Sequence, residues 1–289
     1  MTKIGFIGLG AMGSRIAGRL LTGGHEVYGT NRTAAKAADL IKQGMAWRNT
    51  PREVAAEADL VFSMVTDDTA LMAIADGPDG ILAGLKPGQA YVDMSTVGPR
   101  ISRDIAERAR ALGASMLDAP VSGSVTAAAE GSLAIMVGGP EDVFRSVEPV
   151  LRELGHNVTY VGANGQGLML KLAINISLAA QMLAFSEGVL LAKRGGIDPE
   201  LAARVMTGSP IGSPMLQARA PLMLKLPEQA WFDVRLMHKD IGLVVDTARA
   251  ENVPVPSAEA ADRVLARAEE LGYGQRDIAA FFEVLGQMA

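Results

Sequence analysis

Short apolar runs alternate with segments of helical period through the first half of the chain. The expected strands cover residues 3–8, 25–30, 60–65, 90–94, 115–118, 133–137 and 158–161. The expected helices among them cover residues 11–21, 34–42, 99–112 and 141–154. Alternation of this kind predicts an α/β fold, a doubly wound sheet of parallel strands joined by right-handed helical crossovers.

The pattern changes after Gly162. Strand signals end there, and long helical segments rich in Ala, Leu and Met follow. Residues 162–167 are the expected hinge, and the next helix should run to about Arg194, where two glycines end it. At 1.5 Å per residue such a helix is about 40 Å long. We therefore expect two domains, residues 1–163 and an all-α domain of residues 164–289 that includes this interdomain helix.

Composition narrows the choice of function. The 289 residues are 49% hydrophobic and 20% charged, an ordinary globular balance with room for two cores. The net charge of -5 argues against a nucleic-acid surface. Cysteine is absent, which excludes disulfides and thiolate chemistry. The three histidines, His25, His156 and His238, lack metal-ligand spacing, so no metal site is expected.

Two apolar segments resemble a membrane span or an export signal in hydrophobicity. The run after Lys3 is broken by glycines and no small-residue cleavage site follows it, unlike a signal peptide. The stretch 172–192 carries Asn175, Gln181 and Glu187, which a bilayer core would penalise. A buried helix of a soluble protein explains it better, and we expect a cytoplasmic protein without a membrane partner.

A glycine loop follows the first expected strand. The residues Gly8, Leu9, Gly10, Ala11, Met12 and Gly13 match G-x-G-x-x-G between a strand and a helix. Gly8 allows a tight turn, Gly10 lets a pyrophosphate approach, and Gly13 lets the helix pack on the strand. The helix N-terminus then offers N–H groups to phosphates. A turn without a ligand is the alternative, but the context favours a Rossmann-type dinucleotide site.

The end of the second strand selects the cofactor. NAD-specific sites place a carboxylate there for the ribose 2′-hydroxyl, whereas this chain has Asn31, Arg32 and Thr33. Arg32 is suited to pair with a 2′-phosphate, and Asn31 and Thr33 to hydrogen-bond the same group. A solvated loop arginine is the alternative. We expect NADP(H), with NAD(H) less favoured.

Three further motifs complete a resemblance. They are residues 118–124 with their continuation 127–139, residues 165–175, and the pair Lys239 and Asp240. With the glycine loop, in this order and across nearly the whole chain, they resemble the β-hydroxyacid dehydrogenase family. That family includes 3-hydroxyisobutyrate dehydrogenases, tartronate semialdehyde reductases and glyoxylate/succinic semialdehyde reductases. The resemblance implies an NADP-binding first domain and a second domain for substrate and oligomerisation.

Lys171 and Asn175 are four residues apart and project from one face of the long helix. That face is otherwise apolar, so a lysine there needs a partner or access to water. A lysine that satisfies a carbonyl at the domain junction is the ordinary explanation. The resemblance implies instead that Lys171 is the catalytic general acid/base, and that Asn175 fixes the substrate hydroxyl or carbonyl.

Other site residues come from the resemblance. Ser122 and Gly123, in a loop that is otherwise a plain turn, are implied to hold the substrate acid group. Thr96 corresponds to a family residue near nicotinamide and substrate, and Lys239 to a lysine that reaches the cofactor. Without the resemblance, Lys239 is better explained as a solvated helix lysine. Two further residues, at the end of the third strand, should line the cofactor cleft: Val65 and Thr66.

Two departures from the family pattern affect the substrate. The loop Ser-Gly-Gly has Ser124 in third place, and Ile176 replaces a second asparagine in the helix motif. The expected partner is a small carboxylate-bearing substrate, and the chain should form a homodimer or homotetramer through its helical domain. The rivals are a 6-phosphogluconate dehydrogenase, which is a much longer chain, an imine reductase-like NADPH enzyme, which generally lacks lysine at position 171, and a non-catalytic cofactor-binding protein.

Overall fold

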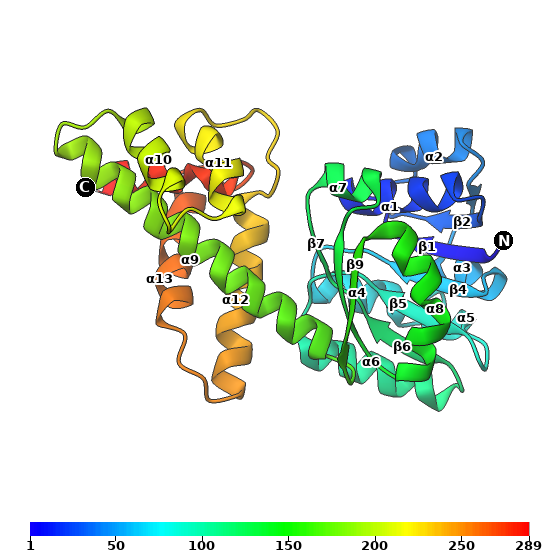
Figure 1. Ribbon diagram of the computed structural model, residues 1–289. Coiled ribbons are helices and arrows are strands. Elements are labelled where there is room, and N and C mark those ends of the chain that lie inside the picture. The colour runs from blue at the N-terminus through cyan, green and yellow to red at the C-terminus, as the bar shows by residue number, and fades with distance from the viewer. Residues whose placement is uncertain (289) are drawn as a thin grey trace. The chain divides into compact units, whose positions relative to one another are not determined.

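The computed structural model describes residues 1–288 and divides into two compact units, Met1–Lys171 and the chain from Leu172 onward (Figure 1). The division falls inside one helix, α9 (Gln166–Arg194), rather than at the expected boundary between residues 163 and 164. The reason is packing, because Leu168 lies in the core of unit 1 and Leu172 in the core of unit 2. The first turns of α9 therefore belong to the α/β unit.

Unit 1 is built on a sheet with the strand order β3-β2-β1-β4-β5-β6-β8-β7, and β9 pairs with β8. The strands are β1 (Lys3–Ile7), β2 (Glu26–Thr30), β3 (Ala46–Trp47), β4 (Leu60–Ser63), β5 (Ala90–Asp93), β6 (Ser115–Asp118), β7 (Val121–Ser122), β8 (Ala134–Gly138) and β9 (Asn157–Gly162). All pairs from β3 to β6 are parallel. This order places the reversal of winding between β1 and β4.

The sheet is not parallel throughout, and here the expectation was wrong. Strand β8 runs antiparallel to both β6 and β7, and only its pairing with β9 is parallel. The chain between β6 and β8 stays beyond the carboxyl end of β6 instead of crossing back over the sheet. Strand β8 therefore enters the sheet at the end where β6 leaves it.

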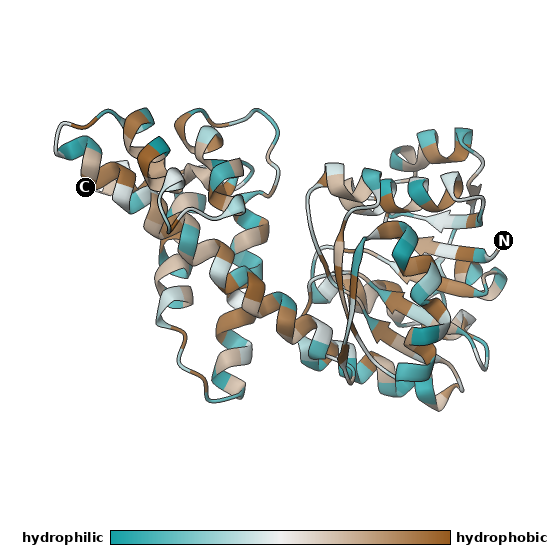
Figure 2. Cartoon of the chain, viewed as in Figure 1, coloured by the Kyte–Doolittle hydropathy of each residue, from teal (hydrophilic) through white to brown (hydrophobic). Residues whose placement is uncertain are grey.

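Helices cover both faces of this sheet. They are α1 (Ala11–Thr22), η1 (Ala34–Ala37), α2 (Ala38–Lys42), α3 (Pro51–Glu57), α4 (Asp68–Ala75), α5 (Ile81–Gly84), α6 (Pro99–Ala111), α7 (Val125–Glu130) and α8 (Glu141–Leu154). Alternate strand residues serve the two faces: Phe62 packs in the core with α1 and α8, whereas Val61 packs in the core with α3 and α6. Figure 2 shows the resulting hydrophobic strands between helices of mixed character. The short β3, β7, α3, α4, α5 and α7 were not predicted.

Unit 2 is helical, as expected. Most of α9 packs there with α10 (Pro199–Gly208), α11 (Pro214–Leu224), α12 (Val234–Ala250), α13 (Pro256–Glu270), η2 (Ile278–Ala280) and α14 (Phe281–Met288). Helix α9 is long and apolar enough to span a bilayer, a property that core helices of soluble proteins share. Five of its residues, together with Leu172, lie in the core of unit 2: Ala179, Met182, Leu183, Phe185 and Val189.

Candidate active site

The residues expected to bind the cofactor gather at one edge of the sheet in unit 1, except Lys239, which lies on α12 of unit 2. Strands β2, β1, β4 and β5 are parallel neighbours, so their carboxyl ends lie side by side. The glycine loop follows β1, and Asn31, Arg32 and Thr33 follow β2. Val65 and Thr66 follow β4, and Thr96 follows β5. In open α/β sheets ligands bind outside this edge, at the point where winding reverses.

Two of the three loop glycines are required by the chain itself. Gly8 has a φ of +94°, and a Cβ there would lie 2.2 Å from the carbonyl oxygen of Met64. A Cβ on Gly13 would lie 2.0 Å from the carbonyl oxygen of Gly8, because α1 packs directly on the end of β1. No L side chain fits at either position without a shift of the backbone.

Gly10 is different, because nothing in the described chain lies within 4 Å of the Cβ it would carry. It is exposed and is the N-cap residue of α1, to which it offers no capping side chain. Open N–H groups and an open approach suit a phosphate group. Ala11 and Met12 form the first turn, so the loop fits the pyrophosphate of a dinucleotide cofactor.

The loop after β2 supports the glycine loop. The amide oxygen of Asn31 accepts a hydrogen bond of 3.0 Å from the buried Leu9 N–H, and its Nδ2 donates to the Thr33 carbonyl. Asn31 thus braces the two loops against each other, a role that the sequence did not indicate. Arg32 is exposed and forms no ion pair with any described residue. Its guanidinium is therefore available at the cofactor edge.

A buried network lies beneath the loops after β4 and β5. The hydroxyl of Ser95 accepts a hydrogen bond of 2.9 Å from Val65 N and donates at 2.7 Å to the carboxyl of Asp93. Burial raises the pKa of Asp93 to about 6. Thr66 and Thr96 follow Val65 and Ser95 in the chain; Thr66 is exposed and Thr96 is partly buried. No role was predicted for Asp93, although a carboxylate at the end of a buried apolar strand indicates a functional or paired group.

The start of α9 is fixed at the same edge of unit 1. Asp118, the last residue of β6, accepts hydrogen bonds from Gly165 N at 2.6 Å and from Leu168 N at 3.0 Å. Its carboxylate thus satisfies N–H groups at the helix N-terminus and interacts favourably with the positive end of the helix dipole. Lys171 follows within the next turn, is partly buried and belongs to unit 1. The candidate general acid/base is therefore tied by its helix to the edge where the cofactor residues gather.

The expected carboxylate loop also extends past this edge. Asp118 pairs with Gly138, and Ser122 pairs with Ala134, the first residue of β8. Gly138 and Ala134 are four residues apart in β8, so the pairing at Ser122 lies roughly 13 Å beyond the end of β6. Gly123 is exposed with a φ of +149°.

The hydroxyl of Ser124 accepts a hydrogen bond from Ala127 N and caps α7. Ser124, the departure from the family pattern, thus has a structural role as a helix cap. The partly buried Ser122 is the hydroxyl in this loop that comes before it.

In unit 2, Asn175 is fully buried and donates from Nδ2 to Asp240 on α12, at 2.7 Å. Its Oδ1 has no hydrogen-bond partner among residues 1–288. Lys239 forms an ion pair of 2.6 Å with the same Asp240. Ile176, the second departure, packs against the core of unit 2. The last two sequence motifs therefore meet through Asp240, for which the sequence predicted no role.

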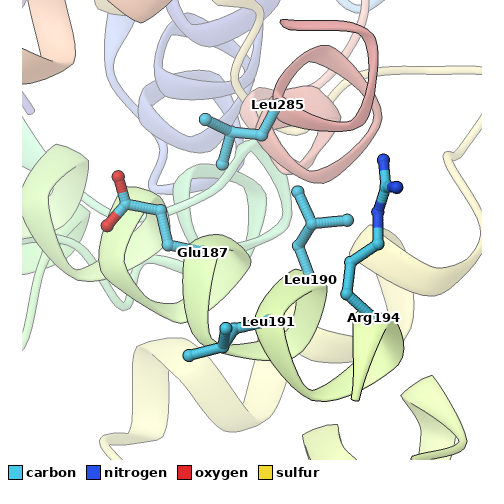
Figure 3. A pocket seen from close by; sticks show the side chains of 5 residues that line it. All are labelled: Glu187, Leu190, Leu191, Arg194 and Leu285. Carbon is cyan, nitrogen blue, oxygen red and sulfur yellow. The ribbon is translucent and has the colours of Figure 1, made fainter. Parts of the chain in front are cut away.

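Two hollows on the surface of the individual units contain none of the site residues. One, of about 260 Å³, is lined by Arg19, Thr22, Gly23 and Glu153 in unit 1. The other lies on unit 2 between α9 and α14; its side chains, shown in Figure 3, are Glu187, Leu190, Leu191, Arg194 and Leu285.

Comparisons with known proteins agree with this geometry. Residues 3–162 match the family model of the NAD binding domain of 6-phosphogluconate dehydrogenase. Residues 165–285 match the model described as NAD-binding of NADP-dependent 3-hydroxyisobutyrate dehydrogenase. The 2-hydroxy-3-oxopropionate reductase of Escherichia coli is 35% identical over 288 residues, which cover 99% of this chain and 98% of the relative.

The chain belongs to the β-hydroxyacid dehydrogenase family. Chloroplastic glyoxylate/succinic semialdehyde reductase 2 of Arabidopsis thaliana is also similar, with 33% identity over 98% of this chain and 79% of the relative. The solved structure of Mycobacterium tuberculosis 3-hydroxyisobutyrate dehydrogenase with L-serine has a TM-score of 0.89 and 30% identity, and covers 99% of both chains. As a member of this family, the protein is an NAD(P)-dependent oxidoreductase that acts on CH–OH donors.

Proposed function

We propose that the protein transfers a hydride between NADP(H) and a small β-hydroxyacid/semialdehyde pair, with Lys171 as general acid/base. The observation that carries the proposal is the hydrogen bonding of Asp118 to the start of α9, which fixes Lys171 near the sheet edge that holds the glycine loop. The candidate alcohol and aldehyde pairs are 3-hydroxyisobutyrate with methylmalonate semialdehyde, 4-hydroxybutyrate with succinic semialdehyde, glycerate with tartronate semialdehyde, and the alcohol of glyoxylate with glyoxylate. The named activities of the relatives support these choices.

The cofactor preference rests on the end of β2. Residues 30–33 contain no carboxylate for a ribose 2′-hydroxyl, and the exposed Arg32 has no ion-pair partner in the described chain. A guanidinium there favours a 2′-phosphate. The N-terminus of α1 and the open space above Gly10 would hold the pyrophosphate. When bound, the nicotinamide ring of the cofactor supplies or accepts the hydride. A preference for NADPH over NADH favours the reductive direction.

Lys171 supplies the proton. In reduction its ammonium donates a proton to the substrate carbonyl oxygen as that oxygen gains negative charge, and in oxidation the neutral amine takes the hydroxyl proton. The charge of the ammonium also stabilises the oxygen before the proton moves. The lysine thus serves as the electrophile, and the proposed reaction requires no metal ion.

The remaining residues orient the substrate. Ser122 supplies a hydroxyl and Gly123 a backbone N–H to a carboxylate, in a loop that extends past the sheet edge. The amide oxygen of Asn175 has no hydrogen-bond partner among the described residues, and Asn175 lies one helical turn from Lys171. It can therefore accept a hydrogen bond from the substrate hydroxyl or from the lysine itself. Its Nδ2 is held by Asp240, which fixes the orientation of the amide. Positioning of this kind lowers the entropic part of the barrier.

Steady-state oxidation of NADPH and of NADH tests the proposal. The panel contains succinic semialdehyde, glyoxylate, tartronate semialdehyde and methylmalonate semialdehyde. We expect a preference for NADPH and a clearly best semialdehyde. A preference for NADH would overturn the role of Arg32 and leave that of Lys171 intact. Turnover of a cyclic imine but of no semialdehyde would favour the imine reductase alternative. Cofactor binding without turnover of any substrate would favour a non-catalytic protein.

A further inference from the structure

Three neighbouring strands of unit 1 end in polar residues that lie in one row. Ser63 pairs with Asp93, and Asp93 pairs with Asp118, across β4, β5 and β6. All three are fully buried. They follow Val61, Tyr91 and Met116 by two positions, so they lie on the sheet face that α3 and α6 cover. A polar row inside a buried face requires an explanation.

Asp118 is explained by the start of α9, but Asp93 makes a different set of contacts. Its Oδ1 accepts hydrogen bonds from the hydroxyls of Ser63 at 2.6 Å and Ser95 at 2.7 Å. Ser95 in turn accepts from Val65 N at 2.9 Å, and Tyr91 shares a hydrogen bond of 2.7 Å with Ser63. One carboxyl oxygen therefore connects the end of β4, the end of β5 and the first residues of both following loops.

The other carboxyl oxygen of Asp93 does not stabilise the folded protein. Oδ2 is buried and has no hydrogen-bond partner among residues 1–288. A buried carboxyl group with an unsatisfied oxygen costs free energy, and an apolar side chain of similar size is often equal or better for stability alone. The benefit of Asp93 must therefore come through Oδ1 and the two loops that it connects.

We propose that Asp93 is a positioning residue for the cofactor site, which acts through Ser95 and Val65 to hold the loops after β4 and β5 in one arrangement. The inference rests on the proposed function, in which Val65, Thr66 and Thr96 of these loops face the cofactor. Asp93 itself is buried beneath the edge and touches neither cofactor nor substrate. It fixes the positions of the residues that do.

The strand order predicts which half of the cofactor depends on Asp93. Arg32 follows β2 and Thr96 follows β5, three strand spacings away in the order β2-β1-β4-β5. Three spacings of about 4.8 Å place these positions roughly 14 Å apart. Since Arg32 is assigned to the adenosine 2′-phosphate, the loops beyond β4 and β5 lie toward the nicotinamide half. Disturbing Asp93 should weaken that half alone.

The test compares two buried serine hydroxyls in the same unit. Ser95→Ala removes the bonds to Asp93 and Val65, whereas Ser102→Ala on α6 removes a buried hydroxyl that has no hydrogen-bond partner in the described chain. Dissociation constants are measured for NADPH and for 2′,5′-ADP, which carries only the adenine half. We expect Ser95→Ala to raise the value for NADPH about tenfold and leave that for 2′,5′-ADP unchanged. Ser102→Ala should alter neither.

A second pair of variants separates positioning from folding. Asp93→Asn keeps an oxygen at Oδ1 for both serines, so NADPH affinity should stay within about threefold of the wild type. Asp93→Leu removes the acceptor and should weaken NADPH binding as Ser95→Ala does. An unchanged NADPH affinity in Ser95→Ala, or an equal loss for 2′,5′-ADP, would overturn the inference alone. Failure of the wild-type protein to bind NADPH would overturn the proposed function and the inference with it.

Discussion

The cofactor edge of unit 1 and the Asn175 region of unit 2 are specified in different ways. At the edge, the decisive positions are backbone positions: a Cβ on Gly8 or Gly13 would lie 2.2 or 2.0 Å from a carbonyl oxygen. In unit 2 the decisive groups are side chains, and Asn175 meets Asp240 across 65 residues of sequence. A backbone site is therefore visible in a local motif, whereas a side-chain site depends on which helices pack together.

The largest expected effect is on turnover. Lys171→Ala should lower kcat by roughly a thousandfold, because it removes both the proton donor and the charge that stabilises the developing alkoxide. The dissociation constant for NADPH should stay within about twofold, since the glycine loop is untouched. Lys193→Ala, near the far end of the same helix, is the matched control. An unchanged kcat in Lys171→Ala, measured by NADPH absorbance, would remove the lysine from the mechanism.

The glycine loop offers a comparison within one motif. Gly13→Ala should cost about 3 kcal/mol of unfolding free energy, because its Cβ collides with backbone. Gly10→Ala should change the unfolding free energy by less than about 0.5 kcal/mol and weaken NADPH binding at least tenfold, because the space it fills is reserved for the pyrophosphate. Thermal unfolding and NADPH titration of both variants separate the two roles. Equal stability losses would contradict the distinction.

Asp93 should give the stability of the protein a recognisable dependence on pH. Its pKa is raised by burial from 3.8 to about 6. Between pH 4 and 6 the native state therefore keeps a proton that the unfolded chain has released. This contribution is present below pH 4 and is lost as the pH rises through 6. Asp93→Asn should therefore gain stability relative to the wild type with rising pH, by at most about 3 kcal/mol.

Urea unfolding of both proteins at pH 4.5, 5.5, 6.5 and 7.5 measures the difference. Burial also raises the pKa of the neighbouring Asp118, but Asp118 is present in both proteins, so the comparison largely removes its contribution. A difference that is the same at every pH would show that Asp93 does not titrate in this window.

The smallest expected effect is on cofactor choice. Arg32→Ala should weaken NADPH binding by about tenfold and leave NADH binding unchanged, since an exposed guanidinium contributes one charge-assisted contact to the 2′-phosphate. Lys36→Ala, an exposed cation in the same loop region, is the control. Equal changes for the two cofactors would mean that Arg32 does not read the 2′-phosphate.

The sequence pattern predicted the elements that interactions between neighbouring residues determine. Strands β1, β2, β4, β5 and β6, the glycine loop and the end of α9 at Arg194 follow from apolar runs, turn glycines and helical period. The antiparallel β8 was missed because its direction depends on a connection that stays beyond the sheet edge. The contacts of Asp93 with Ser63, of Asp118 with Gly165 and of Asn31 with Leu9 were missed because each joins residues that are distant in sequence. The site residues of unit 2 could be named only from the family resemblance.

Isotope transfer tests the central claim most directly. The wild-type enzyme is incubated with NADPH deuterated at C4 on one face or on the other, together with its best semialdehyde. The alcohol product is then analysed by mass spectrometry. The account predicts one deuterium at the carbinol carbon from one labelled cofactor and none from the other. Alcohol formed without deuterium from either cofactor, or no alcohol from any semialdehyde, would contradict hydride transfer as the function of this protein.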